Sequence, residues 1–158
     1  MDNGFHTFRG YQLLNHEQQD LTPSMEDYLE MIYRNCEQEG HVRMNQLAGQ
    51  LNVRVSSATK IVQKLAKLGF LHYQPYGIIE LTEKGKQTGQ FLLHRHQTLE
   101  RFLRMLGLGG TLLQDTEMIE HQASPALLTQ IDLFLRFLEQ NPAVATAWQQ
   151  FCRPAADC

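Results

Sequence analysis

Six side chains with oxygen or nitrogen donors could act together, although they lie far apart along the chain. Asp27 and Glu30 form a first group near the beginning of the first helical pattern. Glu117, Glu120 and His121 form a second group far downstream, and His96 lies along the chain between the two groups. Carboxylate oxygens with a minority of imidazole nitrogens suit a hard divalent cation such as Mn²⁺, and neither group contains a thiolate that would favour a softer ion. The two groups together predict a metal ion that joins two segments of the chain.

Helical spacing decides which of these donors can act together. Residues three apart share one helix face, which places Asp27 beside Glu30. The i, i+3, i+4 spacing of Glu117, Glu120 and His121 brings these three side chains to one side of their helix. Each group also has a plainer interpretation, because acids on a helix are usually a solvated face. The acids become metal ligands only if another segment covers them.

His96 borders the apolar stripe of a long helix, where a single histidine is more often structural than a ligand. His94 faces roughly the opposite side of that helix, so the two histidines do not form a chelating pair. Glu100 follows one turn after His96. It is a candidate for a further ligand or for an outer partner that orients the imidazole.

The residues between the two donor groups predict a winged helix-turn-helix. A helix follows Thr22-Pro23-Ser24, with Ser24 as the candidate cap, and Gly40 ends it. A short helix over 46–51 and a turn over 52–54 come next. Ser56 and Ser57 are expected to cap the following helix, which ends at Gly69. Two strands over 70–73 and 78–81, joined by a turn, complete the order helix, helix, helix, hairpin.

The third of these helices has the composition of a DNA-reading helix. Its hydroxyls and amide can hydrogen-bond base edges, and its basic side chains can neutralise phosphates. The candidate DNA-binding residues are Arg54, Ser56, Ser57, Thr59, Lys60, Gln63 and Lys64. The alternative is an ordinary solvated helix face. The preceding short helix and the following hairpin favour DNA binding, and the small size of the domain predicts a two-fold dimer on a palindromic operator.

The remainder of the chain is predicted to be helical. A helix over 83–106, a second over 112–122, a third that ends at Asn141-Pro142 and a short fourth around 144–151 follow the hairpin. The apolar residues Leu127, Ile131, Leu135 and Leu138 have no evident partner inside a small winged-helix domain. Helices 88–106 and 126–139 are therefore expected to form an apolar dimer surface.

These patterns give a mainly α protein in three parts. Residues 1–21 form an N-terminal arm, residues 22–86 the winged helix-turn-helix DNA-binding domain, and residues 87–158 an all-helical metal-binding and dimerisation domain. The 158 residues, 42% of them hydrophobic, are enough for a buried core. The net charge of −3 argues against a general nucleic-acid binder, but no acid occurs from Gly40 to Ile79, so the basic character is local.

Several classes of protein are not favoured. The three cysteines form no CxxC pair, which argues against a disulfide scaffold. The N-terminus has no apolar signal segment, and no run of about 18 apolar residues occurs. We therefore expect a cytoplasmic protein without a membrane partner. A di-metal helical enzyme would need paired Glu-x-x-His motifs or an HExxH motif, and both are missing, so we expect neither enzymatic activity nor a small-molecule substrate.

Several of these segments resemble the diphtheria-toxin-repressor-like metalloregulators, and most closely their manganese transport regulator branch. The segments are PSMEDYLE at 23–30, SSATKIVQKL at 56–65, LTEKG at 81–85, RH at 95–96, LERFL at 99–103 and EMIEH at 117–121. The resemblance runs from about residue 22 to residue 140. The sequence departs from the family in its longer N-terminal arm and in its wing, residues 74–77, which lacks the usual basic side chains.

The resemblance implies that a pair of divalent ions binds between the winged-helix and dimerisation domains of each subunit. It implies ligand roles for Asp27, Glu30, His96, Glu117, Glu120 and His121. The iron-responsive branch has a methionine at the position of Asp27 and a cysteine at that of Glu120, so the ligand types favour Mn²⁺. The expected function is a homodimeric, manganese-activated repressor of manganese uptake genes. The alternatives are an Fe²⁺-responsive repressor of the same family, a di-metal enzyme, and a winged-helix adaptor with solvated acidic faces.

Overall fold

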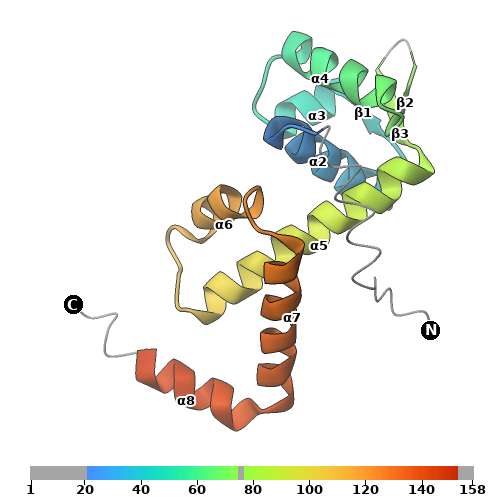
Figure 1. Ribbon diagram of the computed structural model, residues 1–158. Coiled ribbons are helices and arrows are strands. Elements are labelled where there is room, and N and C mark those ends of the chain that lie inside the picture. Colours follow the sequence, from blue (N-terminus) through green and yellow to red (C-terminus); the bar gives the residue numbers. More distant parts are fainter. Residues whose placement is uncertain (1–20, 75–76, 153–158) are drawn as a thin grey trace. The chain divides into compact units, whose positions relative to one another are not determined.

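The computed structural model describes residues 21–74 and 77–152 and divides the chain into two compact units, one ending at Leu93 and the other beginning at His94. The first unit contains α2 (Pro23–Glu39), β1 (Val42–Arg43), α3 (Met44–Gln50), α4 (Val55–Lys67), β2 (Leu71–Tyr73), β3 (Ile78–Leu81) and the first half of α5 (Glu83–Met105). The second contains the rest of α5, α6 (Leu112–Glu120), α7 (Pro125–Gln140) and α8 (Pro142–Cys152) (Figure 1). The expected arm lies almost wholly outside the described residues.

The first unit has the order predicted for a winged helix-turn-helix, with one additional strand. The sheet order is β1-β3-β2, and both pairings are antiparallel, with Val42 opposite Ile79 and Leu71 opposite Leu81. β1 was not predicted, because a strand of two residues is too short to show an alternating pattern. In unit 1, α3 lies beside α2 and α4 (Figure 1).

Helix α2 begins two residues earlier than expected. Thr22, not Ser24, is the N-cap, and its Oγ1 accepts a hydrogen bond of 3.4 Å from the backbone N–H of Met25. Pro23 occupies the first helical position, where its missing N–H leaves no hydrogen bond unmade. Gly40 ends the helix in the left-handed region at φ 78°, as predicted.

The predicted cap of α4 is also wrong. Arg54 is the N-cap residue and makes no side-chain capping bond, while Ser56 and Ser57 lie inside the first turn. In the preceding turn, Asn52 adopts a φ of 54°. Asparagine tolerates this left-handed conformation better than most residues, which allows a sharp connection between α3 and α4.

The beginning of α5 lies very close to the rest of the first unit. Thr82 Oγ1 donates to the carbonyl oxygens of Gly69 and Phe70, at 2.7 and 3.0 Å, and accepts from the N–H of Gly85 at 3.0 Å. A Cβ on Gly85 would lie 2.0 Å from the Phe70 carbonyl oxygen. A Cβ on Gly89 would lie 2.6 Å from Tyr33 Cβ. Only glycine permits this approach of α5 to its neighbours.

The described residues of the second unit form helices joined by turns, without a strand. Leu99 and Leu103 of α5 are buried, as are the α7 residues Leu128, Ile131, Leu135 and Leu138. Phe102 and Phe134 join α5 to α7 through an edge-to-face contact with 6.2 Å between ring centroids. Trp148 Nε1 donates a 2.7 Å hydrogen bond to the carbonyl oxygen of Met105, which attaches α8 to the end of α5.

The burial of α7 corrects the expected dimer surface. Ile131, Leu135 and Leu138 are at most 6% exposed, so they belong to the core of the protomer, and only Leu127 of the predicted set is exposed. A different face of α7 is apolar and exposed, with Leu133, Phe134 and Phe137 between 43% and 50% accessible. Periodicity identified an apolar helix but not which of its faces is covered. None of the described helices is long and apolar enough to cross a membrane.

Replacement of Gly85 by alanine tests the close approach of α5. The new Cβ would overlap the Phe70 carbonyl oxygen, so Gly85→Ala should lower the free energy of unfolding by about 1–3 kcal/mol. Gly49→Ala is the matched control, because no heavy atom lies within 4 Å of its Cβ position and alanine favours a helix. Urea unfolding measures both variants. Equal stability of the two variants would contradict the close contact.

Candidate functional site

The second unit brings four of the six predicted donors together. His96 is on α5, Glu117 and Glu120 are on α6, and His121 is the residue that ends α6. His96 Nδ1 donates a 2.9 Å hydrogen bond to Glu120 Oε2 and lies 3.7 Å from Glu117 Oε1. His121 Nε2 lies 3.8 Å from Glu120 Oε1. We call these four side chains the acid–histidine cluster.

Glu120 is at the centre of the acid–histidine cluster and is only 1% exposed. An ionised carboxylate out of water needs hydrogen bonds or positive charge around it. His96, 6% exposed, supplies one hydrogen bond, and the ligand atoms of Glu117, Glu120 and His121 lie within 4.8 Å of one another. Glu117, Glu120 and His121 therefore offer three ligand atoms at a spacing that a divalent cation can bridge, and the two carboxylates are of the type that suits Mn²⁺.

A buried arginine next to the cluster was not anticipated from the sequence. Arg95 is 5% exposed, and its Nη2 lies 3.4 Å from Nδ1 of His121. Its guanidinium places a permanent positive charge beside the cluster. Its position directly before His96 was the one feature of the sequence that pointed to it, but the pattern does not show that the side chain is buried.

The other two predicted donors lie one turn apart on α2, in the first unit. Glu30 is 8% exposed, and its Oε1 accepts hydrogen bonds from Nε and Nη2 of Arg34, at 3.0 and 2.5 Å. Asp27 is half-buried. Arg34 therefore neutralises Glu30 from within the same helix. A cation that uses Glu30 as a ligand must share its carboxylate with Arg34 or displace it.

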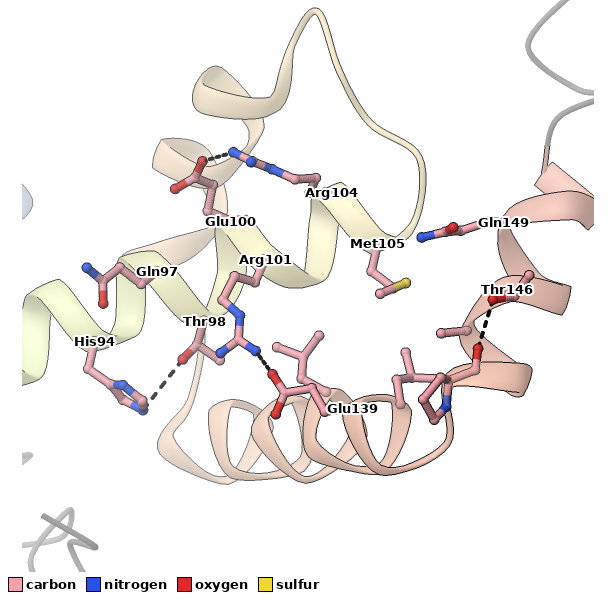
Figure 2. Close-up of a pocket in the computed structure, with 14 residues that line it drawn as sticks. His94, Gln97, Thr98, Glu100, Arg101, Arg104, Met105, Glu139, Thr146 and Gln149 are labelled. Atoms are coloured by element: carbon pink, nitrogen blue, oxygen red, sulfur yellow. Dashed lines mark hydrogen bonds and ion pairs between the residues drawn. The ribbon is translucent and has the colours of Figure 1, made fainter. Parts of the chain in front are cut away.

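Glu100 points into a different part of the second unit. Its carboxylate pairs with Arg104, one turn further along α5. Both line a cavity of about 710 Å³ between α5, α7 and α8, together with His94 and the ion pair of Arg101 with Glu139 (Figure 2). No member of the acid–histidine cluster lines this cavity. The spacing of Glu100 from His96 does not by itself bring the two side chains to one site.

The candidate DNA-binding residues lie on the exposed side of α4 and at its beginning. Arg54, Ser56, Ser57, Lys60, Gln63 and Lys64 are exposed, and Thr59 is half-buried. Ala58, Val62 and Leu65 form the buried side, whereas Ile61 and Leu68, also expected there, are only partly buried. Thr59 Oγ1 donates to the carbonyl oxygen of Val55 at 2.8 Å, so this hydroxyl is already engaged within the helix.

The described cysteines do not belong to either donor group. Cys36 is half-buried on α2, and burial raises the pKa of its thiol. A raised pKa keeps the side chain a neutral thiol, which is a poor metal ligand. Cys152 lies on α8, and Cys158 is outside the described residues. The donors that the described residues bring together are carboxylate oxygens and imidazole nitrogens.

A winged helix followed by a helical unit with clustered carboxylates and imidazoles defines a metal-regulated DNA-binding protein. Residues 20–79 match the family described as iron dependent repressor, N-terminal DNA binding domain. Residues 82–149 match iron dependent repressor, metal binding and dimerisation domain. The chain therefore belongs to the iron-dependent repressor family of metal-binding, dimeric transcriptional regulators.

Individual relatives agree with this assignment. The chain is 42% identical over 121 residues to the HTH-type transcriptional regulator MntR of Geobacillus thermodenitrificans. This alignment covers 76% of this chain and 86% of that protein. It is 42% identical over 124 residues to the MntR of Lysinibacillus sphaericus, covering 78% and 89%. Members of this family are regulators rather than enzymes.

Two solved structures are similar in fold. The manganese regulator SloR has a TM-score of 0.63 at 28% identity, and the metal-dependent transcriptional regulator MtsR has a TM-score of 0.66 at 28% identity. Each comparison covers 74% of this chain and 55% of the solved chain. The chain thus spans about half the length of these two proteins.

Proposed function

We propose that the protein is a homodimeric, manganese-activated transcriptional repressor. Residues 22–86 form its DNA-binding domain and residues 87–158 its metal-binding and dimerisation domain. The observation that carries the proposal is the acid–histidine cluster, in which His96 and the deeply buried Glu120 are 2.9 Å apart in a unit of the dimerisation type. Its targets, as the resemblance to the manganese transport regulators implies, are genes for manganese uptake.

The metal ligands that we propose are Asp27, Glu30, His96, Glu117, Glu120 and His121. When bound, a divalent ion supplies positive charge that the carboxylates of both units can share. Asp27 and Glu30 then hold α2, while the acid–histidine cluster holds α5 and α6. Because the two sets of ligands belong to different units, their joint use of one metal centre would restrict the movement of one unit against the other. Four carboxylates and two imidazoles are enough for a pair of Mn²⁺ ions per subunit with water as further ligand.

The regulatory effect follows from differential affinity. Without a cation, four carboxylates with the same charge repel one another when they approach. A metal that binds only one arrangement of the units favours that arrangement. Changing its population from 1:99 to 99:1 takes about 5.5 kcal/mol, which is a moderate requirement for two ions with several ligands each.

DNA binding depends on the spacing of two α4 helices in the dimer. Successive major grooves on one side of B-DNA are about 34 Å apart, so a dimer with fixed reading helices binds a palindromic operator better than one whose helices vary in separation. The exposed Ser57, Lys60 and Gln63 are the residues that we assign to base edges and phosphates, with Arg54, Ser56, Thr59 and Lys64 beside them. In this proposal, metal binding increases operator affinity because it fixes the spacing of the two α4 helices.

Mn²⁺ and Fe²⁺ are both candidates, since the family is described as iron dependent while SloR is described as a manganese regulator. The all-oxygen-and-nitrogen ligand set favours Mn²⁺, because a thioether or thiolate would increase the preference for softer ions. Anaerobic titration of operator binding with each ion separates the two. A lower half-saturating concentration of Fe²⁺ than of Mn²⁺ would identify an iron-responsive repressor.

Glu120→Gln tests the metal switch. Glutamine preserves the size of the side chain but removes the charge at the centre of the cluster, so we expect Mn²⁺-dependent operator affinity to fall by at least about 100-fold. Fluorescence anisotropy with labelled operator, with and without Mn²⁺, measures the effect. Glu139→Gln is the control, because this acid of the same unit is exposed and pairs with Arg101 outside the cluster. Equally tight operator binding by metal-free and Mn²⁺-loaded wild type would refute the switch.

Lysine and glutamine substitutions on α4 test the DNA interface. Lys60→Ala and Lys64→Ala should weaken binding to every DNA sequence and each reduce the slope of log affinity against log salt by about 1. Gln63→Ala should instead cost about 1–3 kcal/mol on the operator alone and relax its sequence preference. Lys86→Ala, an exposed lysine on α5, is the control. Unchanged operator affinity in all three α4 variants would exclude α4 as the reading helix.

The exposed apolar face of α7 predicts a dimer that does not depend on metal. Phe137 is 50% exposed, and Leu133 and Phe134 extend the same apolar surface. Phe137→Asp should raise the dimer dissociation constant at least about 30-fold, because two-fold symmetry introduces the charge twice and an interface aromatic often contributes about 2 kcal/mol. Phe137→Leu should preserve the dimer. Sedimentation at micromolar concentration, with and without Mn²⁺, is the measurement, and a metal-free wild-type monomer is the contrary result.

A further inference from the structure

A cluster of three amide side chains joins α2 to α3 inside the first unit. Asn35 of α2 is 7% exposed and lies opposite Gln46 and Gln50 of α3. Asn35 Nδ2 donates to Gln50 Oε1 at 2.8 Å, and Gln50 Nε2 donates back to Asn35 Oδ1 at 3.1 Å. Gln46 Nε2 donates to the same Asn35 oxygen at 2.9 Å. We call these three residues the amide cluster.

The amide cluster uses the full hydrogen-bonding capacity of Asn35. The second Nδ2 hydrogen goes to the carbonyl oxygen of Met31, at 2.7 Å. Two donated and two accepted bonds are all that an asparagine side chain can make. The reciprocal pair with Gln50 is also directional, since each amide must present its nitrogen to the oxygen of the other. Any rotation or sliding of α2 against α3 would break several of these bonds together.

The position of Gln50 gives the amide cluster its significance. Gln50 is the last residue of α3, and the turn into α4 begins directly after it. Asn52 in that turn has a φ of 54°, and the N–H of Val53 donates to the carbonyl oxygen of Ala48 at 3.0 Å, so the connection is short and tightly bonded. Fixing the end of α3 on α2 therefore fixes the beginning of the helix that carries the candidate DNA-binding residues.

Apolar contacts alone would constrain this arrangement less. Leu29 and Ile32 of α2 and Val62 and Leu65 of α4 are fully buried, and α2 packs directly on α4. Burial of apolar surface is not directional, so it tolerates small rotations of one helix on another. Hydrogen bonds have strong distance and angle requirements. The amide cluster is the directional part of the connection between α2 and the helix-turn-helix.

We propose that Asn35 is a positioning residue that transmits metal binding at α2 to the reading helix α4. The proposal rests on the proposed function, in which Asp27 and Glu30 of α2 are metal ligands. Asn35 lies on the same helix, about two turns beyond Asp27. Ligation of α2 can fix α4 only as firmly as α2 itself is attached to the helix-turn-helix. Asn35 with Gln50 provides that attachment at the end of α3 nearest to the turn.

The test compares the effect of Mn²⁺ on operator affinity in Asn35→Leu, in Gln50→Ala and in the wild type. Leucine has the same branching at Cγ as asparagine and makes none of its hydrogen bonds, although its side chain is larger. We expect the increase in operator affinity on adding saturating Mn²⁺ to be about tenfold smaller in each variant, which corresponds to about 1.4 kcal/mol. Mn²⁺ affinity of the DNA-free protein, measured by calorimetry, should stay within twofold of wild type.

Two further variants complete the design. The double variant should lose no more than the larger single loss, because both changes break the same reciprocal pair and their effects are not additive. Gln87→Ala, an exposed amide on α5 of the same unit, should behave as wild type. Gln50 is exposed at the end of its helix, so we expect Gln50→Ala to fold. This variant therefore tests the positioning role even if Asn35→Leu does not fold.

The contrary results are distinct. A normal Mn²⁺ response in Gln50→Ala and Asn35→Leu overturns the positioning role and leaves the proposed function intact. So does an equal loss of operator affinity with and without Mn²⁺ together with a lower melting temperature, because that pattern reflects stability alone. A wild-type protein whose operator affinity does not respond to Mn²⁺ contradicts the proposed function itself, and the positioning role with it.

Discussion

A carboxylate that is buried away from water needs hydrogen bonds or positive charge around it. This requirement determines which side chains surround Glu120 in the helical unit. Glu120 is 1% exposed, and the ring nitrogen of His96 lies 2.9 Å from its oxygen. Arg95 is buried nearby and lies against His121. His96 and Arg95 supply a hydrogen bond and positive charge at this cluster, and a divalent cation would add charge that both of its carboxylates can share. In the proposed function, the stability of this arrangement depends on a bound divalent ion, which is the physical basis of a sensor.

The proposed ligand Glu30 on α2 is also a buried carboxylate that needs a compensating charge, and it lies in the DNA-binding unit. Glu30 accepts hydrogen bonds from Arg34 of the same helix, so part of its charge is balanced within α2. In the proposed metal site, the pairing with Arg34 would moderate the affinity for a metal, because a cation must compete with the guanidinium for Glu30. Moderate affinity suits a regulator that responds to changes in metal concentration. The amide cluster of Asn35, Gln46 and Gln50 then determines how rigidly α2 carries α4.

Much of the fold could be predicted from periodicity and from turn residues. The order of helices and the hairpin followed from apolar spacing, and Gly40 and Gly69 were recognised as helix ends, where φ is 78° and 82°. The failures had local causes. Thr22 caps α2 in place of Ser24, since the capping residue must stand directly before Pro23 at the first helical position. β1 has two residues, too few for an alternating pattern.

The sequence by itself determined the types of donor and their spacing on single helices, because residues three or four apart share a face in any α-helix. It therefore identified Glu117, Glu120 and His121 as one group. Only the tertiary structure decided that His96, 24 residues before Glu120, completes that group and that Glu100 turns to Arg104 instead. It also decided that Ile131, Leu135 and Leu138 are core while Phe137 is exposed. Contacts between helices depend on how whole faces pack together, and a pattern along one helix carries no information about its partner.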